Sequence, residues 1–178
     1  MILSAPKVDF NVKIIGDVKN STPLIFLHGF MGSMESWNEI VPHFNTPIIL
    51  INLAGHGKSH FNNVDNYLFS DWNNDFKSIL GQLEITQINL CGYSMGGRLA
   101  LSFACEYPQI VNRLILESTT AGIIDESERE KRIGEDLLNM AEINKDYLAF
   151  VKKWSHNQLF INQKKEIPEV GKHNKKSV

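Results

Sequence analysis

Hydrophobic residues along the chain gather in short runs separated by longer connections that have helical spacing. Five runs rich in β-branched residues predict strands at residues 10–15, 24–27, 48–53, 88–91 and 114–116. The last four are apolar at nearly every position, which is typical of strands buried on both faces of a parallel sheet. The first alternates between apolar and polar residues and predicts an edge strand, so we expect a mixed sheet.

The connections between these runs predict crossover helices. Apolar residues recur at helical spacing in residues 37–44 and 72–83. A third helix is expected from Met95 to Tyr107, because Pro108 ends it. Strands that alternate with helices in this order predict an α/β fold, with helices flanking a mostly parallel sheet.

The composition changes after Glu117, where the apolar strand-like runs are followed by charged sequence with helical spacing. Asp125 and Glu128 have the spacing of a capping box, and a second short helix is expected over residues 145–154. From Gln163 the chain is polar and rich in lysine, which is typical of a solvated end. The first of these helices is expected to be amphipathic, with an apolar stripe of Ile133, Leu137, Met140 and Ala141.

Composition places the chain among ordinary globular proteins, with 43% hydrophobic, 21% charged and 10% aromatic residues in 178. The net charge of -2 offers no basic surface to nucleic acid or to an anionic membrane. We find no signal peptide pattern and no run of about 18 apolar residues, so a cytoplasmic protein is expected. Cys91 and Cys105 fall in apolar and helical patterns, which predicts small buried side chains and no metal site.

The segment Gly92-Tyr93-Ser94-Met95-Gly96 carries the clearest chemical signal. It matches the pattern G-x-S-x-G, and it lies directly after a predicted strand and directly before a predicted helix. In that context the serine occupies a strained turn that exposes its hydroxyl group, and the glycines avoid collisions with neighbouring backbone. The positive end of the helix lies close to any oxyanion formed there. We therefore predict Ser94 as the catalytic serine.

A second loop fits this serine. His28-Gly29-Phe30-Met31-Gly32 follows the strand at residues 24–27, where a glycine-bearing loop can supply the other oxyanion donor. We predict an oxyanion hole formed by the backbone N–H groups of Phe30 and Met95, and we expect His28 to order the turn instead of transferring protons. The remaining histidines have no carboxylate or ligand at a suitable spacing and are expected in loops or on the surface: His43, His56, His60 and His173.

These motifs resemble the 2-succinyl-6-hydroxy-2,4-cyclohexadiene-1-carboxylate synthases of menaquinone biosynthesis, a family with the α/β-hydrolase fold. The resemblance extends from Leu24 to about Ile167. It rests on HGFMGS and GYSMGGRLAL, which many hydrolases share in looser form. It rests more specifically on residues 116–123 and on Glu128, Arg129, Arg132, Trp154 and Leu159-Phe160, which resemble the start of the family's cap. By this resemblance, residues 1–120 are the N-terminal part of the core, residues 121–162 begin a helical cap, and residues 163–178 are a polar tail.

The resemblance implies a lyase that needs no cofactor, in which the serine and a histidine assist proton abstraction and pyruvate leaves by elimination. The substrate implied is small and carries several carboxylates. Arg98 lies one helical turn after Ser94, and Arg129 and Arg132 lie three residues apart, which suits contacts with carboxylates. For Arg129 a surface ion pair with Asp125 or Glu126 is an equally good prediction. The residues expected to bind substrate by similarity are Tyr93, Arg98, Arg132 and Trp154.

The chain also departs from the family. Asn52 stands where hydrolases of this class commonly have an acidic residue. In the α/β-hydrolase order, the acid and the histidine follow the serine on later strands, yet no strand-like run follows Leu116. The expectation is therefore a fold truncated after the start of the cap, with weak activity. An apolar strand at residues 114–116 would be left unpaired, and self-association through this sheet edge is expected.

Two other functions remain open at this point, because one fold supports many chemistries. The first is a carboxylesterase or thioesterase of the same fold, which would turn over simple esters and would not respond to the pathway substrate. The second is a non-catalytic protein, which would bind substrate without turnover.

Overall fold

The computed structural model describes residues 1–62 and 66–157. The chain divides into a first unit, Met1–Ala121, and a second unit that begins at Gly122. The polar tail, His173 and the Leu159-Phe160 pair lie outside the described residues. Within the described part of the chain, no helix is both long enough and apolar enough to cross a membrane.

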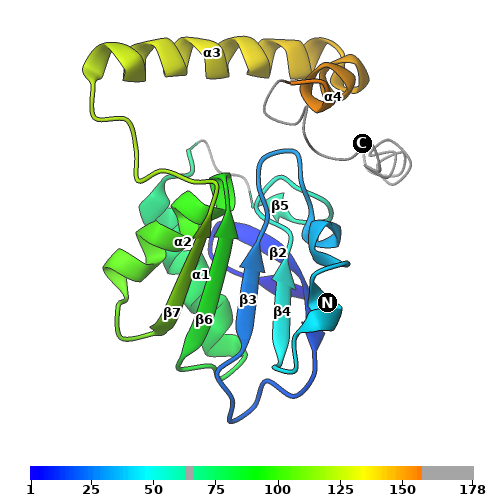
Figure 1. Ribbon diagram of the computed structural model, residues 1–178, viewed down its shortest axis with the longest axis vertical. Helices are drawn as coiled ribbons and strands as arrows, with labels where there is room; N and C mark the ends of the chain where they lie inside the picture. Colours follow the sequence, from blue (N-terminus) through cyan, green and yellow to red (C-terminus); the bar gives the residue numbers. More distant parts are fainter. Residues whose placement is uncertain (63–65, 158–178) are drawn as a thin grey trace. The chain divides into compact units, whose positions relative to one another are not determined.

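The first unit is built on one mixed sheet (Figure 1). The strands follow the order β1-β2-β4-β3-β6-β7, and β5 pairs with β2 beside this path. Strands β3, β4, β6 and β7 are parallel, whereas β2 runs antiparallel to both β1 and β4, so the predicted mixed sheet is confirmed. The bounds are β1 (Ile2–Ser4), β2 (Val8–Ile15), β3 (Leu24–Leu27), β4 (Ile48–Ile51), β5 (His60–Phe61), β6 (Ile88–Tyr93) and β7 (Val111–Glu117).

The position of β2 corrects one prediction. Its alternating pattern predicted an edge strand, but β1 and β5 both pair with its N-terminal half. The sequence did not predict β1 or β5, because strands of three and two residues are too short to establish a hydrophobic period. The alternation of β2 reflects one face buried against the core and one polar face, and it carries no information about strand order.

Two helices, α1 (Phe69–Gln82) and α2 (Met95–Glu106), cover one face of the sheet (Figure 1). Aromatic rings fill the space between them: Trp72 stacks on Phe76 with centroids 4.9 Å apart, and Phe76 meets the edge of Phe103 at 4.6 Å. All three side chains are buried. Burial of such large apolar surfaces is the main favourable contribution that fixes the helices on the sheet.

The opposite face carries short 3₁₀ helices in place of the α-helix that was predicted over residues 37–44. These are η1 (Met34–Trp37) and η2 (Val41–His43). Pro42 lacks a backbone donor and disfavours a helical conformation at the residue before it, so the longer helix does not form. Trp37 nevertheless packs on Phe26 of β3, with ring centroids 4.7 Å apart, so the apolar spacing still serves the core.

The two cysteines differ from each other. Cys91 is buried as predicted, and burial raises the pKa of its thiol to about 11, so it stays protonated at neutral pH. Cys105 is exposed, which contradicts the prediction of a buried side chain. Its helical position alone did not specify which face of α2 it occupies.

The second unit contains α3 (Glu126–Lys145) and α4 (Tyr147–Ser155). The Asp125 carboxylate accepts a hydrogen bond from the Glu128 N–H at 2.9 Å, so the predicted cap at the start of α3 is present. The Lys153 ammonium lies 2.7 Å from the Glu142 carboxylate and joins the two helices. The residues of the predicted stripe on α3 are exposed.

We expect Phe76→Ala to lower the free energy of unfolding by about 3–5 kcal/mol, because it removes a fully buried ring and leaves a cavity between α1 and α2. Phe69→Ala on the same helix is the matched control, since Phe69 is 52% exposed and its loss should change stability by less than about 0.5 kcal/mol. Urea unfolding followed by circular dichroism measures both. Equal effects of the two substitutions would contradict this description of the core.

Candidate active site

Ser94 occupies the turn between β6 and α2 with φ 52° and ψ −113°. A residue with a side chain rarely adopts positive φ, and it does so only where its surroundings hold it there. The Ser94 N–H donates to the Glu117 carbonyl at 2.9 Å. The Ser94 carbonyl accepts from the Thr119 hydroxyl at 2.7 Å and from the Arg98 N–H at 3.2 Å. The strained turn expected from the motif is therefore present and is fixed on both sides.

The glycines of the motif allow the backbones around this turn to touch. A Cβ atom on Gly92 would lie 2.5 Å from the Gly96 carbonyl oxygen. A Cβ atom on Gly96 would collide with the carbonyl oxygens of Leu27 and His28 at the end of β3. The first turn of α2 therefore lies against the ends of two strands, which places Ser94 at the carboxyl edge of the sheet.

The loop of residues 28–32 lies next to Ser94. A Cβ atom on Gly29 would be 2.8 Å from Tyr93 Cδ1 and 3.4 Å from Ser94 Cβ, so only glycine allows this approach. The Gly32 N–H donates to the Gly29 carbonyl at 3.1 Å and closes the loop tightly. This loop carries Phe30, whereas Met95 begins α2, where N–H groups have no acceptor within the helix. Both predicted oxyanion donors thus belong to segments that border the serine.

His28 is fully buried and uses both ring nitrogens within the protein. The Leu53 N–H donates to Nε2 at 3.0 Å, which requires that the proton reside on Nδ1, and Nδ1 donates to the Gly29 carbonyl at 2.8 Å. Burial lowers the pKa of His28 to about 4, although the bond to Gly29 opposes this shift. His28 therefore orders the loop as a neutral side chain and is not available as a base.

Asn52, directly after β4, holds the start of η1, which follows this loop, a role that the sequence did not predict. Its Oδ1 accepts from the Met34 N–H at 2.8 Å, and its Nδ2 donates to Asn11 Oδ1 at 3.2 Å. The Asn52 carbonyl accepts from the Ser59 hydroxyl at 2.7 Å. An aspartate carboxylate at position 52 could not donate to Asn11 Oδ1. The Asn52 amide, which stands in place of the usual acid, therefore suits the amide of Asn11 on β2.

The predicted binding residues divide between the two units. In the first unit, the ring of Tyr93 lies against Gly29, and Arg98 Nη2 lies 3.3 Å from the Thr120 hydroxyl, in the loop that also supplies Thr119. The structure thus brings Tyr93 beside the oxyanion loop and attaches Arg98 to the segment that fixes Ser94. Their roles in binding stay predictions.

In the second unit, Arg132 Nε lies 3.0 Å from both carboxylate oxygens of Asp136, and Trp154 stacks on Phe150 with ring centroids 5.7 Å apart. The binding roles of Arg132 and Trp154 also stay predictions. Arg129 donates to the backbone carbonyls of Ile123 and Ile124, so the ion pair considered for it does not form.

Two further observations concern titratable groups. His60 lies 3.3 Å from the Asp9 carboxylate, a partner that sequence spacing did not reveal because the two residues meet only through the pairing of β2 with β5. In the described part of the chain, Ser94 Oγ makes no hydrogen bond. No group of three histidine, cysteine or acidic side chains among these residues could hold a metal ion.

Comparison with known proteins agrees with this geometry. Residues 22–160 match the family described as the alpha/beta hydrolase fold. A protein of Bacillus subtilis (strain 168), provisionally named a 2-succinyl-6-hydroxy-2,4-cyclohexadiene-1-carboxylate synthase, is 40% identical over 84% of this chain and 56% of its own length. The protein of that name from Klebsiella pneumoniae (strain 342) is 33% identical over 78% of this chain and 55% of its own length. The chain therefore spans little more than half the length of these relatives.

Solved structures give the same picture. MenH from S. aureus superposes with a TM-score of 0.73 at 30% identity, covering 84% of this chain and 58% of the other. A carboxylesterase of Nitrososphaera gargenis superposes with a TM-score of 0.66 at 24% identity, covering 75% of this chain and 50% of the other, and this match concerns the fold alone. The resemblance predicted from the motifs is confirmed.

We expect the buried His28 to make the protein sensitive to acid. Its pKa is 6.5 in the unfolded chain and about 4 in the folded protein, so only the unfolded state takes up this proton between those values. The free energy of unfolding therefore keeps its full contribution from His28 above pH 6.5 and falls as the pH drops. Near pH 4 it is lower by about 3 kcal/mol. In His28→Asn, which is expected to be less stable at neutral pH, unfolding measured from pH 7 to pH 4 should show a correspondingly shallower decline.

The control for this experiment is His43→Asn, the same substitution at a histidine that is exposed on η2. If His28→Asn and the wild type lost stability equally on acidification, the assignment of His28 as a buried, neutral side chain would be wrong.

Proposed function

The chain belongs to the α/β hydrolase fold family, and we propose that within it the protein acts as a 2-succinyl-6-hydroxy-2,4-cyclohexadiene-1-carboxylate synthase. Such an enzyme is a lyase of menaquinone biosynthesis that eliminates pyruvate from a succinyl-enolpyruvyl-cyclohexene carboxylate. The observation that carries the proposal is Ser94, held at positive φ beside the loop of residues 28–32. Similarity to proteins that bear this name supports the choice of reaction.

In the proposed reaction, a base removes a proton from a ring carbon, and the electron pair of that C–H bond forms a ring double bond. The C–O bond to the enolpyruvyl group breaks, and the leaving enolate takes up a proton to become pyruvate. Negative charge that develops on a conjugated carbonyl oxygen would be stabilised by the N–H groups of Phe30 and Met95. The Ser94 hydroxyl would lie at the reacting centre and relay or stabilise the proton in transit.

The base in this proposal is a histidine that contacts Ser94 Oγ in the working enzyme, as the family's order of residues implies. His28 does not fill this role, because Nε2 already accepts from Leu53 and Nδ1 donates to Gly29. A neutral, fully engaged His28 instead keeps the oxyanion loop in place while the proton moves elsewhere.

Substrate recognition in the proposal depends on arginines and aromatic side chains. A guanidinium group can form two parallel hydrogen bonds to one carboxylate, which suits a substrate with several such groups. Among the described residues, the Arg98 guanidinium bonds to the neutral Thr120 hydroxyl, and the Arg132 pair with Asp136 is exposed and worth little. Both arginines can therefore exchange these partners for a substrate carboxylate. Tyr93 and Trp154 would contact the apolar parts of the ring.

The proposal involves no cofactor, nucleic acid or membrane partner, and it places the enzyme in the cytoplasm.

A second candidate is a carboxylesterase or thioesterase. The strained serine beside an oxyanion loop is also the arrangement that acyl transfer requires. A preparation that hydrolyses simple esters and releases no pyruvate from the pathway substrate would favour this alternative.

We expect Ser94→Ala, introduced at the matching position of a full-length relative, to abolish pyruvate release and to leave substrate affinity within a few fold, because the hydroxyl acts in the transition state more than in binding. A coupled assay of pyruvate and calorimetric titration of substrate measure the two effects. Ser70→Ala is the control, since Ser70 is exposed on α1. Turnover by Ser94→Ala at the wild-type rate would exclude the assignment.

Arg98→Ala and Arg132→Ala are each expected to weaken substrate binding by about 1–3 kcal/mol, the range of a charge-assisted hydrogen bond. This corresponds to a rise of roughly 5- to 150-fold in Kd. Lys131→Ala removes an exposed charge beside Arg132 and should leave Kd unchanged. Unaltered affinity in both arginine variants would remove these residues from the binding site.

A further inference from the structure

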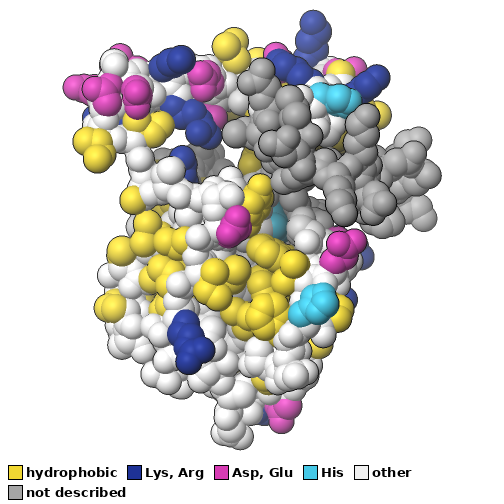
Figure 2. Space-filling model, viewed as in Figure 1, with side chains coloured by type: hydrophobic (Ala, Val, Ile, Leu, Met, Phe, Trp, Pro, Cys, Tyr) yellow, Lys and Arg dark blue, Asp and Glu magenta, His cyan; other side chains and the backbone are white. Residues whose placement is uncertain are grey.

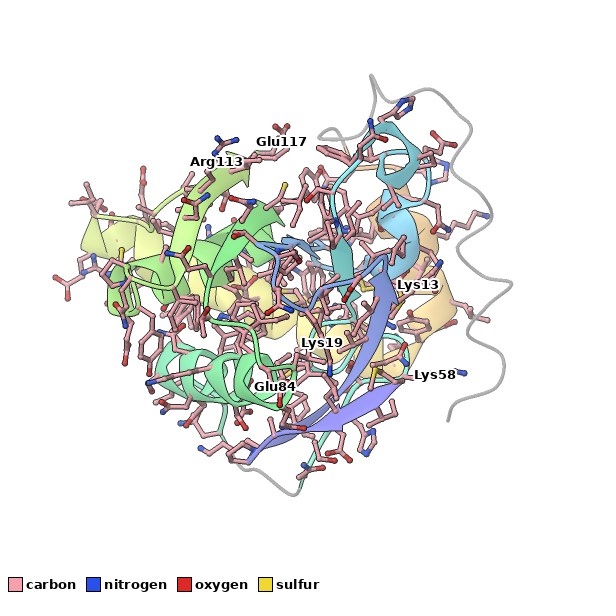
Figure 3. All side chains as sticks on the ribbon, turned by 90° about the horizontal axis from the view of Figure 1, so that it is seen from below. Lys13, Lys19, Lys58, Glu84, Arg113 and Glu117 are labelled. Carbon is pink, nitrogen blue, oxygen red and sulfur yellow. The ribbon has the colours of Figure 1, made fainter. Side chains whose placement is uncertain are left out.

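The end of β7 contacts the two peptide groups that lie on either side of Ser94. The Glu117 carbonyl accepts from the Ser94 N–H at 2.9 Å and so fixes the peptide group before Ser94. The Thr119 hydroxyl donates to the Ser94 carbonyl at 2.7 Å and so fixes the peptide group after it. The Glu117 side chain projects outward (Figure 3), so Glu117 acts on Ser94 through its backbone. One short segment, residues 117–119, therefore holds Ser94 on both sides.

A second strained turn brings Thr119 to this position. Tyr93 and Glu117 are partners in the parallel pairing of β6 with β7, so the residues that follow them occupy matching positions just beyond the two strands. These residues are Ser94 and Ser118, and both have a positive φ, 52° and 49°. A residue with a side chain adopts this conformation only where its surroundings hold it. The turn at Ser118 directs the chain back toward α2 and places the Thr119 hydroxyl at the Ser94 carbonyl.

Gly97 on the first turn of α2 makes room for Thr119. A Cβ atom on Gly97 would lie 2.7 Å from both Cβ and Cγ2 of Thr119 and 2.9 Å from its hydroxyl oxygen. Glycine is a poor helix former, so this position weakens α2 locally and gains the close contact in return. Thr119 therefore packs its methyl group on α2 while its hydroxyl group reaches the Ser94 carbonyl.

The bond from Thr119 bears on the predicted oxyanion hole, because the Ser94 carbonyl and the Met95 N–H belong to one peptide group. This group is planar and trans, so its C=O and N–H point in opposite directions, and whatever fixes the carbonyl also fixes the N–H. The Arg98 N–H donates to the same carbonyl at 3.2 Å from within α2. Thr119 adds a donor from outside the helix and so determines the orientation of the peptide group a second time.

The same bond strengthens the Met95 N–H as a donor. The bond is partly shielded from water, and hydrophobic side chains gather over the sheet in the view of Figure 2. In such surroundings a hydrogen bond is electrostatically stronger than in water, and it polarises the groups next to it. A carbonyl that accepts two hydrogen bonds draws electron density from its peptide nitrogen. The Met95 N–H is thereby made more positive, and it stabilises a nearby negative charge more strongly.

We propose that Thr119 is a positioning residue for the oxyanion hole, because its hydroxyl group holds and polarises the Ser94–Met95 peptide group so that the Met95 N–H faces the developing negative charge. In this role Thr119 contacts no substrate atom and acts through the peptide group alone. The inference rests on the oxyanion hole of the proposed function. It does not depend on the choice between elimination of pyruvate and ester hydrolysis, since both reactions need the same donor.

Two substitutions separate the hydroxyl group of Thr119 from its shape. Thr119→Val keeps the size of the side chain and removes the donor, whereas Thr119→Ser keeps the donor and removes the methyl group. Thr86→Val is the matched control, since Thr86 is exposed and precedes β6 at the end opposite to Ser94. Urea unfolding of every variant confirms that the comparisons below are made between folded proteins.

The rate of labelling by a fluorophosphonate measures the oxyanion hole. In this reaction Ser94 Oγ forms a bond to phosphorus, fluoride leaves with its bonding electrons, the hydroxyl proton passes to solvent, and the phosphoryl oxygen carries the developing negative charge. We expect Thr119→Val to slow labelling roughly tenfold, the upper range for one lost hydrogen bond. Thr119→Ser and Thr86→Val should react within about twofold of the wild type, because the donor is retained.

Nuclear magnetic resonance of the same variants tests the peptide group without a reactive probe. In Thr119→Val, the carbon shift of the Ser94 carbonyl and the nitrogen and proton shifts of the Met95 amide should move, because the peptide group loses one of its two donors. These shifts should stay close to the wild-type values in Thr119→Ser and in Thr86→Val. Neither measurement uses the pathway substrate, so failure of the proposed synthase reaction alone would leave both results unchanged.

Wild-type labelling and wild-type amide shifts in Thr119→Val would overturn the proposal. Equal losses in Thr119→Val and Thr119→Ser would also overturn it, since the packing of the methyl group on Gly97 would then be responsible. A change in the Met95 shifts without slower labelling would mean that Thr119 orders the turn and does not serve the oxyanion hole. Slower labelling with unmoved Met95 shifts would exclude the peptide group as the route, and the proposal would fail in both cases.

Discussion

The close approach of the first turn of α2 to the ends of β3 and β6 is the constraint on which the candidate site depends. It is possible only because Gly92 and Gly96 have no side chains, since a Cβ atom at either position would overlap backbone oxygen. At this approach Ser94 adopts a positive φ, and the bonds from Thr119 and to Glu117 hold it there. The hydroxyl, the helix N-terminus and the oxyanion loop are thereby brought to one edge of the sheet before any substrate arrives, which is the preorganisation that electrostatic catalysis requires.

The oxyanion loop and the start of η1 that follows it are held by neutral polar side chains that are buried and paired. His28 accepts from Leu53 and donates to Gly29, while Asn52 accepts from Met34 and donates to Asn11. Buried polar groups rigidify a structure when every partner is satisfied, and they destabilise it when one partner is lost. The same feature that fixes the loop therefore makes it sensitive to protonation of His28.

The sequence predicted the strands and helices that depend on residues close together in the chain. The run at residues 24–27 agrees with β3, and the helix after Ser94 ends within one residue of the prediction, because β-branched runs, glycines and Pro108 act on their immediate neighbours. The helix predicted over residues 37–44 was wrong, since apolar spacing is retained even though Pro42 prevents an α-helix. The partners of Asn52 lie 18 and 41 residues away in the chain, so its support of the loop appears only when β2 and β4 pair. The same limit applies to Arg98, whose contact with Thr120 depends on the position of β7 beside β6.

The central claim is that the strained turn makes Ser94 the reactive group of the protein. The most direct measurement is labelling with a fluorophosphonate, followed by peptide mass spectrometry, with heat-denatured protein as the reference. We expect a single label on Ser94 in the native protein and none after denaturation, because the helix N-terminus and the oxyanion loop that stabilise the charge formed during labelling surround Ser94 only in the folded protein. Labelling at another residue, or equal labelling of native and denatured protein, would contradict the account.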